Sequence, residues 1–99
     1  MARFDLFKNA TGPGYLLDVQ ADILSGLNTR VVVPLLPKSS APSPADRLNP
    51  VFEVEGERVV MATQFLAAVP GSELRPRIGS LAKERHEISA ALDMLFMGF

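Results

Sequence analysis

The sequence contains no cysteine and a single histidine. The absence of cysteine excludes disulfide bonds, thiolate catalysis and the common cysteine-ligated zinc sites, and it is typical of a protein in the reducing cytoplasm. The single histidine, His86, has no partner at the spacing that a metal site or a catalytic triad requires, so we interpret it as a solvated surface residue. We predict neither a metal nor another cofactor.

The chain also lacks an excess of either charge and lacks a long apolar run. Lys and Arg number 10 against 11 Asp and Glu, giving a net charge of -1. No basic surface is therefore expected to neutralise phosphates, and we predict no direct nucleic-acid binding. No segment approaches the roughly 20 apolar residues of a membrane span, and the start of the sequence does not have the pattern of a signal peptide. We predict a cytoplasmic protein without membrane contact.

No pattern in the sequence indicates an enzyme. Residues 12–14 read Gly-Pro-Gly, but no Lys-Ser or Lys-Thr follows, so a plain turn is favoured over a phosphate loop. The acidic residues form no visible pair, although a pair formed across the fold stays open. Arg75 and Arg77, with Lys83 and Arg85, form the one basic cluster; an ordinary solvated loop is favoured over a patch for an acidic partner. We predict a protein without catalytic residues.

Apolar side chains, by contrast, are abundant for so short a chain. The 99 residues make one domain, residues 1–99. A domain of this size buries only about 60–70% of the surface that its unfolded chain exposes. Hydrophobic residues make up 47% of the chain before its seven glycines are counted. This share is above the usual ~45–50% for the apolar class that includes glycine, and the surplus predicts an oligomer.

Five segments have the pattern of strands, at residues 3–7, 15–20, 30–36, 51–54 and 58–61. Gly56 lies between the last two and predicts a hairpin turn with positive φ. Pro34 cannot donate to a neighbouring strand, so we expect it at a sheet edge, a bulge or a strand end. Residues 37–50 are rich in proline and serine and predict a loop, with one helical turn capped at residues 43–46. For residues 63–69 the sequence does not decide between a short element of secondary structure and a loop.

Residues 81–97 predict the one long helix, because apolar residues recur there at spacings of four, three and four. The stripe consists of Ile88, Leu92, Leu95 and Phe99. Met97 lies off this stripe, so the helix end is apolar on more than one side. We expect the end to be covered by the protein's own core, by a second copy or by a foreign protein. The order of elements predicts an α+β, mainly β fold: a small, strongly bent antiparallel sheet or barrel carrying the helix.

Six short segments are distinctive when they are taken together: DVQADIL at 18–24, RVVVPL at 30–35, NPV at 49–51, MAT at 61–63, AVP at 68–70 and LFMGF at 95–99. With these segments the chain resembles the CcdB toxins, which poison DNA gyrase and are paired with a CcdA antitoxin. The resemblance runs from end to end in order, spacing and length. It implies an SH3-like barrel of the CcdB, MazF and Kid type. It also implies a homodimer packed about the C-terminal helix, with Ile88, Leu92 and Leu95 at the interface.

The same resemblance implies a topoisomerase inhibitor that binds the gyrase A subunit and traps the cleaved-DNA complex without turnover. It implies neutralisation by a CcdA-like antitoxin and transcriptional autoregulation of the module. The implied gyrase-binding residues are Ile23, Leu24, Asp93, Phe96, Met97, Gly98 and Phe99. For Ile23 and Leu24, a role in packing is an open alternative.

The tail departs from the family at one position that matters for its chemistry. Familiar members end Phe-Trp-Gly-Ile, and their tryptophans stack on a gyrase arginine, a cation–π contact of roughly 0.5–2 kcal/mol. Met97 stands in place of that tryptophan, and methionine has no π face. Phe99 replaces the isoleucine and Asp93 a helical asparagine. The alternative function is therefore a non-toxic homologue that keeps the dimer and antitoxin binding. A third, a ribonuclease like MazF and Kid, requires an acid, a base and an arginine that binds phosphate.

Overall fold

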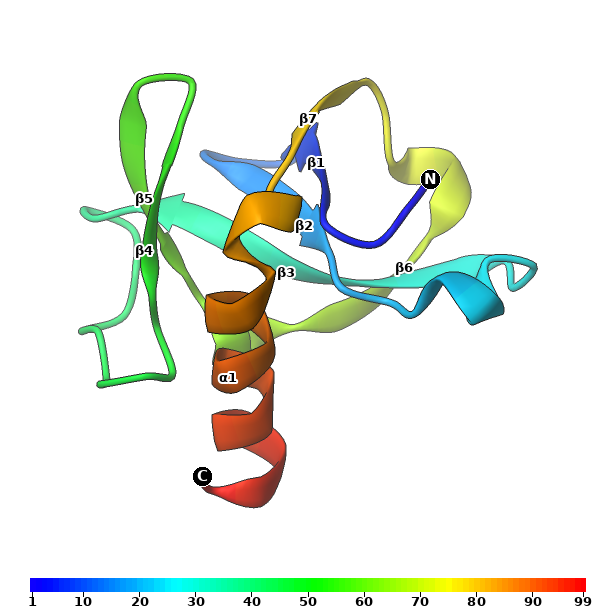
Figure 1. Cartoon of the computed structure of the whole chain (residues 1–99). Helices are drawn as coiled ribbons and strands as arrows, with labels where there is room; N and C mark the ends of the chain where they lie inside the picture. The colour runs from blue at the N-terminus through cyan, green and yellow to red at the C-terminus, as the bar shows by residue number, and fades with distance from the viewer.

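Seven strands form one antiparallel sheet in the computed structural model, which describes residues 1–99 (Figure 1). The strands are β1 (Asp5–Lys8), β2 (Tyr15–Asp18), β3 (Thr29–Pro37), β4 (Val51–Val54), β5 (Glu57–Met61), β6 (Ala67–Pro70) and β7 (Arg77–Ser80). Their order is β4-β5-β3-β2-β1-β7, and β6 pairs with β3. Short 3-10 turns lie at η1 (Asp22–Leu24), η2 (Thr63–Phe65), η3 (Gly71–Glu73) and η4 (Ala82–Glu84), and α1 (Arg85–Met97) follows. The mainly β class and the small barrel are confirmed.

The long strand β3 organises the sheet because it changes neighbour along its length. Residues 29–32 pair with β6 and residues 35–37 pair with β5. Pro34 lies between these two ladders, where its missing N–H removes no strand hydrogen bond, and its carbonyl accepts from the Ala62 N–H at 2.9 Å. The expectation of an edge, bulge or strand end was therefore wrong: the proline is inside the strand, at the point where one neighbour ends and the next begins.

The sequence located five strands, missed β7 and left residues 63–69 open, where the structure has η2 and most of β6. The strands β6 and β7 read Ala-Ala-Val-Pro and Arg-Ile-Gly-Ser. Neither has an alternating or β-branched pattern, so pairing with β3 and β1 defines them. The hairpin turn is confirmed, with positive φ at Gly56 and also at Glu55. The turn expected at residues 43–46 lies slightly later, where the Asn49 N–H donates to the Ala45 carbonyl at 3.0 Å.

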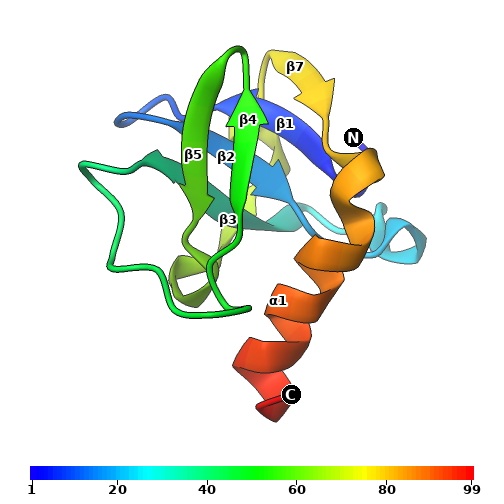
Figure 2. The same cartoon turned by 60° about the vertical axis from the view of Figure 1, so that its left-hand side comes forward.

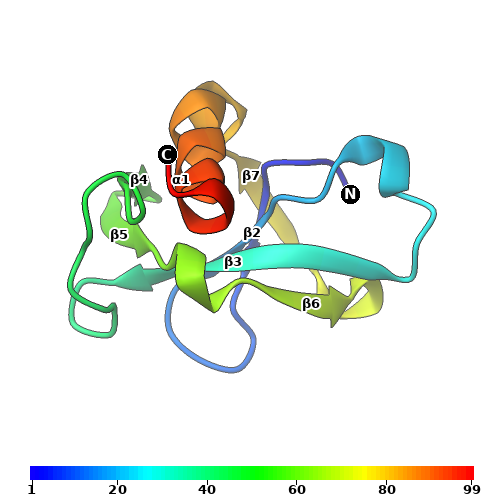
Figure 3. The same cartoon turned by 90° about the horizontal axis from the view of Figure 1, so that it is seen from below.

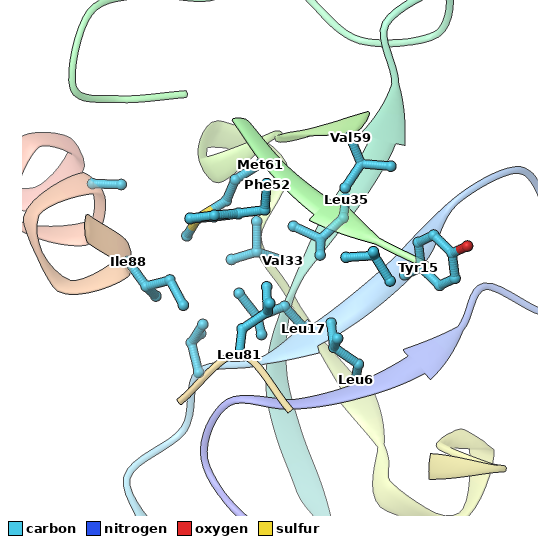
Figure 4. Close-up of a cluster of buried hydrophobic side chains, with 13 residues drawn as sticks. Leu6, Tyr15, Leu17, Val33, Leu35, Phe52, Val59, Met61, Leu81 and Ile88 are labelled. Carbon is cyan, nitrogen blue, oxygen red and sulfur yellow. The ribbon is translucent and has the colours of Figure 1, made fainter. Parts of the chain in front are cut away.

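The main hydrophobic core lies on the inner face of the curled sheet, against α1. Alternate residues of the strands point inward, among them Leu17, Val33 and Leu35, none of which is exposed. The outward residues Phe7 and Val32 join Leu74 in a second, smaller cluster on the other face. Figure 4 shows Ile88 pointing from α1 into the main cluster. The helix is thus held by its first half.

The helix begins later than the sequence predicted. The Ala82 N–H donates to the Ser80 hydroxyl at 3.1 Å, and the Glu84 N–H donates to the Leu81 carbonyl at 2.8 Å, which gives the 3-10 turn η4. The α-helix starts only at Arg85. Figures 1 and 2 show that its second half extends past the sheet, so no strand covers the end of the chain.

Candidate functional site

The end of α1 presents large apolar side chains to solvent. Phe96 is 67% exposed, Met97 55% and Phe99 72%. Contiguous apolar surface of this kind on a small protein marks a contact site, because each side chain gains free energy when a partner removes it from water. Of the three covers that the sequence allowed, the protein's own core is excluded. We call these three residues, with Gly98, the tail surface.

Gly98 shapes this surface through its backbone. It closes α1 in the left-handed conformation, with φ 81°, and its N–H donates to the Met94 carbonyl at 3.1 Å. No atom lies within 4 Å of the position a Cβ would take. The glycine is therefore required by the turn and not by a close neighbour.

Asp93 is an exposed acid one helical turn before Met97. The two ion pairs of the structure join Arg30 to Asp18 and Arg77 to Asp5, so the Asp93 carboxylate has no internal partner. Residues four apart lie on the same helical face. Asp93 and Met97 are therefore exposed neighbours on one face of α1.

The stripe predicted to face a second copy divides into two parts. Ile88 is fully buried in the core of its own chain, so a second copy cannot contact its side chain. This corrects its place among the interface residues; the periodicity identified the buried face but not where the sheet ends. Leu92 and Leu95 are half-buried, with Leu92 packed against the core. These two residues retain apolar surface for another chain.

The other two predicted gyrase contacts lie on η1. Ile23 is 91% exposed, and Leu24 and the unpredicted Leu27 are also exposed. We call these three residues the η1 surface. Figures 1 to 3 show η1, in light blue, apart from the end of α1, in red, in each view. One chain therefore does not bring the predicted gyrase contacts into a single patch.

Sequence reasoning missed two exposed apolar residues beside these surfaces. Leu27 lies in a Ser-Gly-Leu-Asn turn, where a large apolar side chain among turn residues was the available signal. Phe65 is 52% exposed on η2, and η2 contacts α1. It offers an aromatic face on the element that packs beside the helix. Nothing in its local sequence distinguished it from a core residue.

The basic cluster noted in the sequence does not form a single patch. Arg77 Nε pairs with Asp5 Oδ1 at 3.0 Å, and the Arg75 guanidinium binds the Ser72 carbonyl, so the basic cluster divides. His86 is exposed on α1, away from both pairs. No group of three His, Cys, Asp or Glu side chains is placed to hold a metal ion. None of the helices is long and apolar enough to cross a membrane.

Two open clefts are lined by no residue of the tail surface. The first, of about 560 Å³, lies between residues 44–50 and α1, and Arg47 and Glu87 are among its lining residues. The second, of about 650 Å³, lies between residues 9–11 and η3 over the smaller core, and Arg75 lines it. The loop at 37–50 and Arg75 are thus both part of concave surfaces.

These features define a small, mainly β barrel whose terminal helix presents an uncovered apolar end. The family model described as "CcdB protein" matches residues 3–98, and the chain belongs to the CcdB family. Its structure is also similar to an endoribonuclease in complex with its cognate antitoxin from a mycobacterial species. That match has a TM-score of 0.72 and 13% identity and covers 95% of this chain and 92% of the other. At this identity the likeness shows a shared fold.

Proposed function

We propose that this protein is the toxin of a type II toxin–antitoxin module and that it binds the DNA gyrase A subunit. Membership of the CcdB family supports the assignment as a toxin. The observation that carries the gyrase contact is the tail surface, where Phe96, Met97 and Phe99 are uncovered on a helix that extends past its sheet. The bound protein holds the cleaved-DNA complex and blocks religation, so it acts by binding and not by turnover.

The proposal includes a homodimer packed about α1. The helix is apolar on more than one side, and the single chain covers only the side of Ile88 and Ala91. A second copy that packs on Leu92 and Leu95 covers the next side and leaves the tail surfaces of both chains free. A two-fold arrangement presents the same contact twice, as a symmetric pair of gyrase A subunits requires.

The proposal also includes a CcdA-like antitoxin. The structural neighbour of the same fold is described in complex with its cognate antitoxin, which supports a partner of this kind. The two clefts offer concave surface for an extended segment, and each is bordered by both apolar and charged side chains. Neither cleft is lined by a residue of the tail surface, so an antitoxin segment bound there contacts other residues than gyrase does.

The chemistry of the tail differs from that of familiar toxins because Met97 replaces an aromatic side chain. Methionine offers a polarisable contact of adaptable shape but cannot stack a guanidinium on a π face. Asp93 lies on the same face one turn earlier and has no internal cation. A gyrase arginine over Met97 therefore gains a charge-assisted contact with Asp93 in place of the stack.

Met97 is also the observation that favours the alternative function, a non-toxic homologue that keeps the dimer and antitoxin binding. Loss of the stack in both chains of a dimer costs on the order of 2–4 kcal/mol, or roughly thirty- to a thousandfold in affinity. If Asp93 does not compensate, the protein binds its antitoxin without poisoning gyrase. The ribonuclease of the shared fold has no such support here, because no acid, base and arginine converge.

A gyrase assay with the purified protein tests the proposal. The wild type should inhibit supercoiling by gyrase from its own host and should accumulate cleaved DNA. The comparison is Met97→Trp, which restores an aromatic face at the same position. If a large molar excess of wild type does neither while Met97→Trp does both, the non-toxic alternative replaces the proposal. If neither protein acts, the gyrase contact is wrong. Incubation with RNA, which should stay intact, tests the ribonuclease.

A further inference from the structure

The η1 surface is held by a buried side chain to which no role has been assigned. Gln20 follows β2 and is only 7% exposed. Its Nε2 donates to the Leu24 carbonyl at 3.1 Å, and its Oε1 accepts from the Val31 N–H at 3.1 Å. One amide therefore joins the end of η1 to strand β3. A buried amide with both ends satisfied is a rigid bridge.

The backbone on both sides of this bridge is fixed as well. The Gln20 N–H donates to Asp18 Oδ1 at 3.0 Å, and Asp18 Oδ2 accepts from Arg30 Nε at 2.7 Å. Asp18 and Arg30 are at most 2% exposed. The backbone of Gln20 is thus bonded to a buried ion pair. This bond fixes the position from which the Gln20 side chain reaches η1.

The turn itself has little else to hold it. Its local bonds run from the Leu24 N–H to Ala21 and from the Ser25 N–H to Asp22, at 3.0 and 3.1 Å, and the Leu24 carbonyl also accepts from the Leu27 N–H at 3.0 Å. None of the residues of η1 is buried. Ile23, 91% exposed, therefore contributes nothing to folding by burial. The hydrogen bond that holds the turn in this position is the one from Gln20 Nε2 to the Leu24 carbonyl. A bond from the Arg3 N–H to the Asp22 carboxylate at 2.7 Å supports it.

We propose that Gln20 is a positioning residue that holds the η1 surface outward for contact with the gyrase A subunit. This inference rests on the proposed function, in which Ile23 and Leu24 are gyrase contacts. An apolar surface on an untethered turn must be ordered when it binds, and the ordering costs affinity. With the amide bridge in place, the turn is ordered before gyrase arrives.

Two substitutions at Gln20 distinguish the effect of the amide bridge from an effect on the fold of the sheet. Gln20→Leu has nearly the same size and removes both side-chain bonds. Gln20→Glu keeps an acceptor for the Val31 N–H but places a carboxylate against the Leu24 carbonyl, so it releases η1 while β3 stays paired. Asn9→Ala is the matched control, because it removes an amide that bridges another loop: its Nδ2 donates to the Pro13 carbonyl and its Oδ1 accepts from the Thr11 N–H and hydroxyl.

Amide hydrogen exchange of the free protein and binding to the isolated gyrase A subunit test the inference together. In both Gln20 variants the Leu24 and Ser25 amides should exchange at least about tenfold faster, whereas only Gln20→Leu should expose the Val31 amide. Affinity for the gyrase A subunit should fall about tenfold in both, and Asn9→Ala should change neither measurement.

Unchanged exchange at Leu24 and Ser25 would overturn the inference, whatever gyrase does. Faster exchange with unchanged affinity, where the wild type binds, would also overturn it. If the wild type itself does not bind the gyrase A subunit, the proposed function fails and the positioning role toward gyrase falls with it. In that case, unaltered exchange of the Leu24 and Ser25 amides in the Gln20 variants would show separately that Gln20 does not hold η1.

Discussion

Arg30 and Asp18 form an ion pair inside the sheet, with Nε donating to Oδ2 at 2.7 Å and at most 2% of either side chain exposed. The ladder pairs Asp18 with Val32, and Arg30 lies two residues before Val32 on β3, diagonally across from Asp18 on the same face. Arg30 Nη2 is buried without a hydrogen-bond partner. The pair is therefore fully buried but not fully satisfied, and through the bond from the Gln20 N–H to Asp18 it supports the start of the segment that carries the η1 surface.

Arg30→Met should destabilise the protein by about 3–5 kcal/mol, because it leaves the Asp18 carboxylate buried without a cation. The measurement is the free energy of unfolding in urea. The double variant Asp18→Asn with Arg30→Met should recover part of the loss, since no buried charge then remains. A single variant within about 1 kcal/mol of wild type would show that the pair does not hold the sheet together.

The ion pair shows where sequence reasoning stops. Both residues lay in segments recognised as β2 and β3, but their pairing depends on which residues face each other across the ladder. The same limit applies to β6 and β7, whose sequences have no strand pattern and whose conformation comes from β3 and β1. The hydrophobic patterns that do not depend on a partner, in β3, β4, β5 and the helix, were located correctly.

The candidate site was predicted in the same uneven way. The periodicity of α1 identified its buried stripe, and the apolar tail indicated a contact surface. The periodicity could not show that Ile88 is enclosed by its own chain whereas Leu95 is not, because the point where the sheet ends is a property of the whole fold. Nor could the sequence reveal that Ile23 is almost wholly exposed or that Gln20 ties its turn to β3.

The raised pKa of Tyr15 predicts that the protein loses stability at high pH. Burial raises its pKa above the ordinary value of 10.0, and the hydrogen bond and charge of Glu55 add to the shift. The neutral phenol is therefore favoured in the folded state, and its contribution is present below pH 10.0 and lost as the pH rises through the higher folded-state pKa. The stability difference between wild type and Tyr15→Phe should be constant from pH 7 to 9 and shrink above about pH 10. A difference that stays constant to pH 11 would contradict the raised pKa.

Leu95→Asp should dissociate the proposed dimer without unfolding the chain. Leu95 is half-buried on α1 beyond the sheet, so a charge there is tolerated in a single chain and is costly only against a second copy. Sedimentation should give a monomer with an unchanged circular dichroism spectrum. Ile88→Ala is the contrasting variant: it should lower the free energy of unfolding of each chain by about 2–5 kcal/mol through a core cavity. A wild type that sediments as a monomer would refute the dimer.

Gly98→Ala should disturb the tail surface through backbone strain alone. The left-handed conformation costs a residue with a Cβ roughly 1–2 kcal/mol, and no neighbouring atom adds a clash. The end of α1 should fray, and the amide of residue 98 should exchange faster. Gly98→Asn should show a smaller effect, because asparagine tolerates this conformation better. Equal effects of the two substitutions would show that the side chain, and not the backbone, is responsible.

Asp93→Asn should weaken binding to the gyrase A subunit by about tenfold, the equivalent of ~1.4 kcal/mol, because it removes the carboxylate that meets a partner cation over Met97. The loss should diminish as salt rises, since the pair is exposed. In a Met97→Trp background it should be smaller, because an indole face then binds the same cation. Glu87→Gln, which removes another exposed acid of α1, is the control and should leave affinity unchanged. Equal losses in the two backgrounds would mean that Asp93 and residue 97 contact different groups on gyrase, and the compensation proposed for the missing tryptophan would not hold.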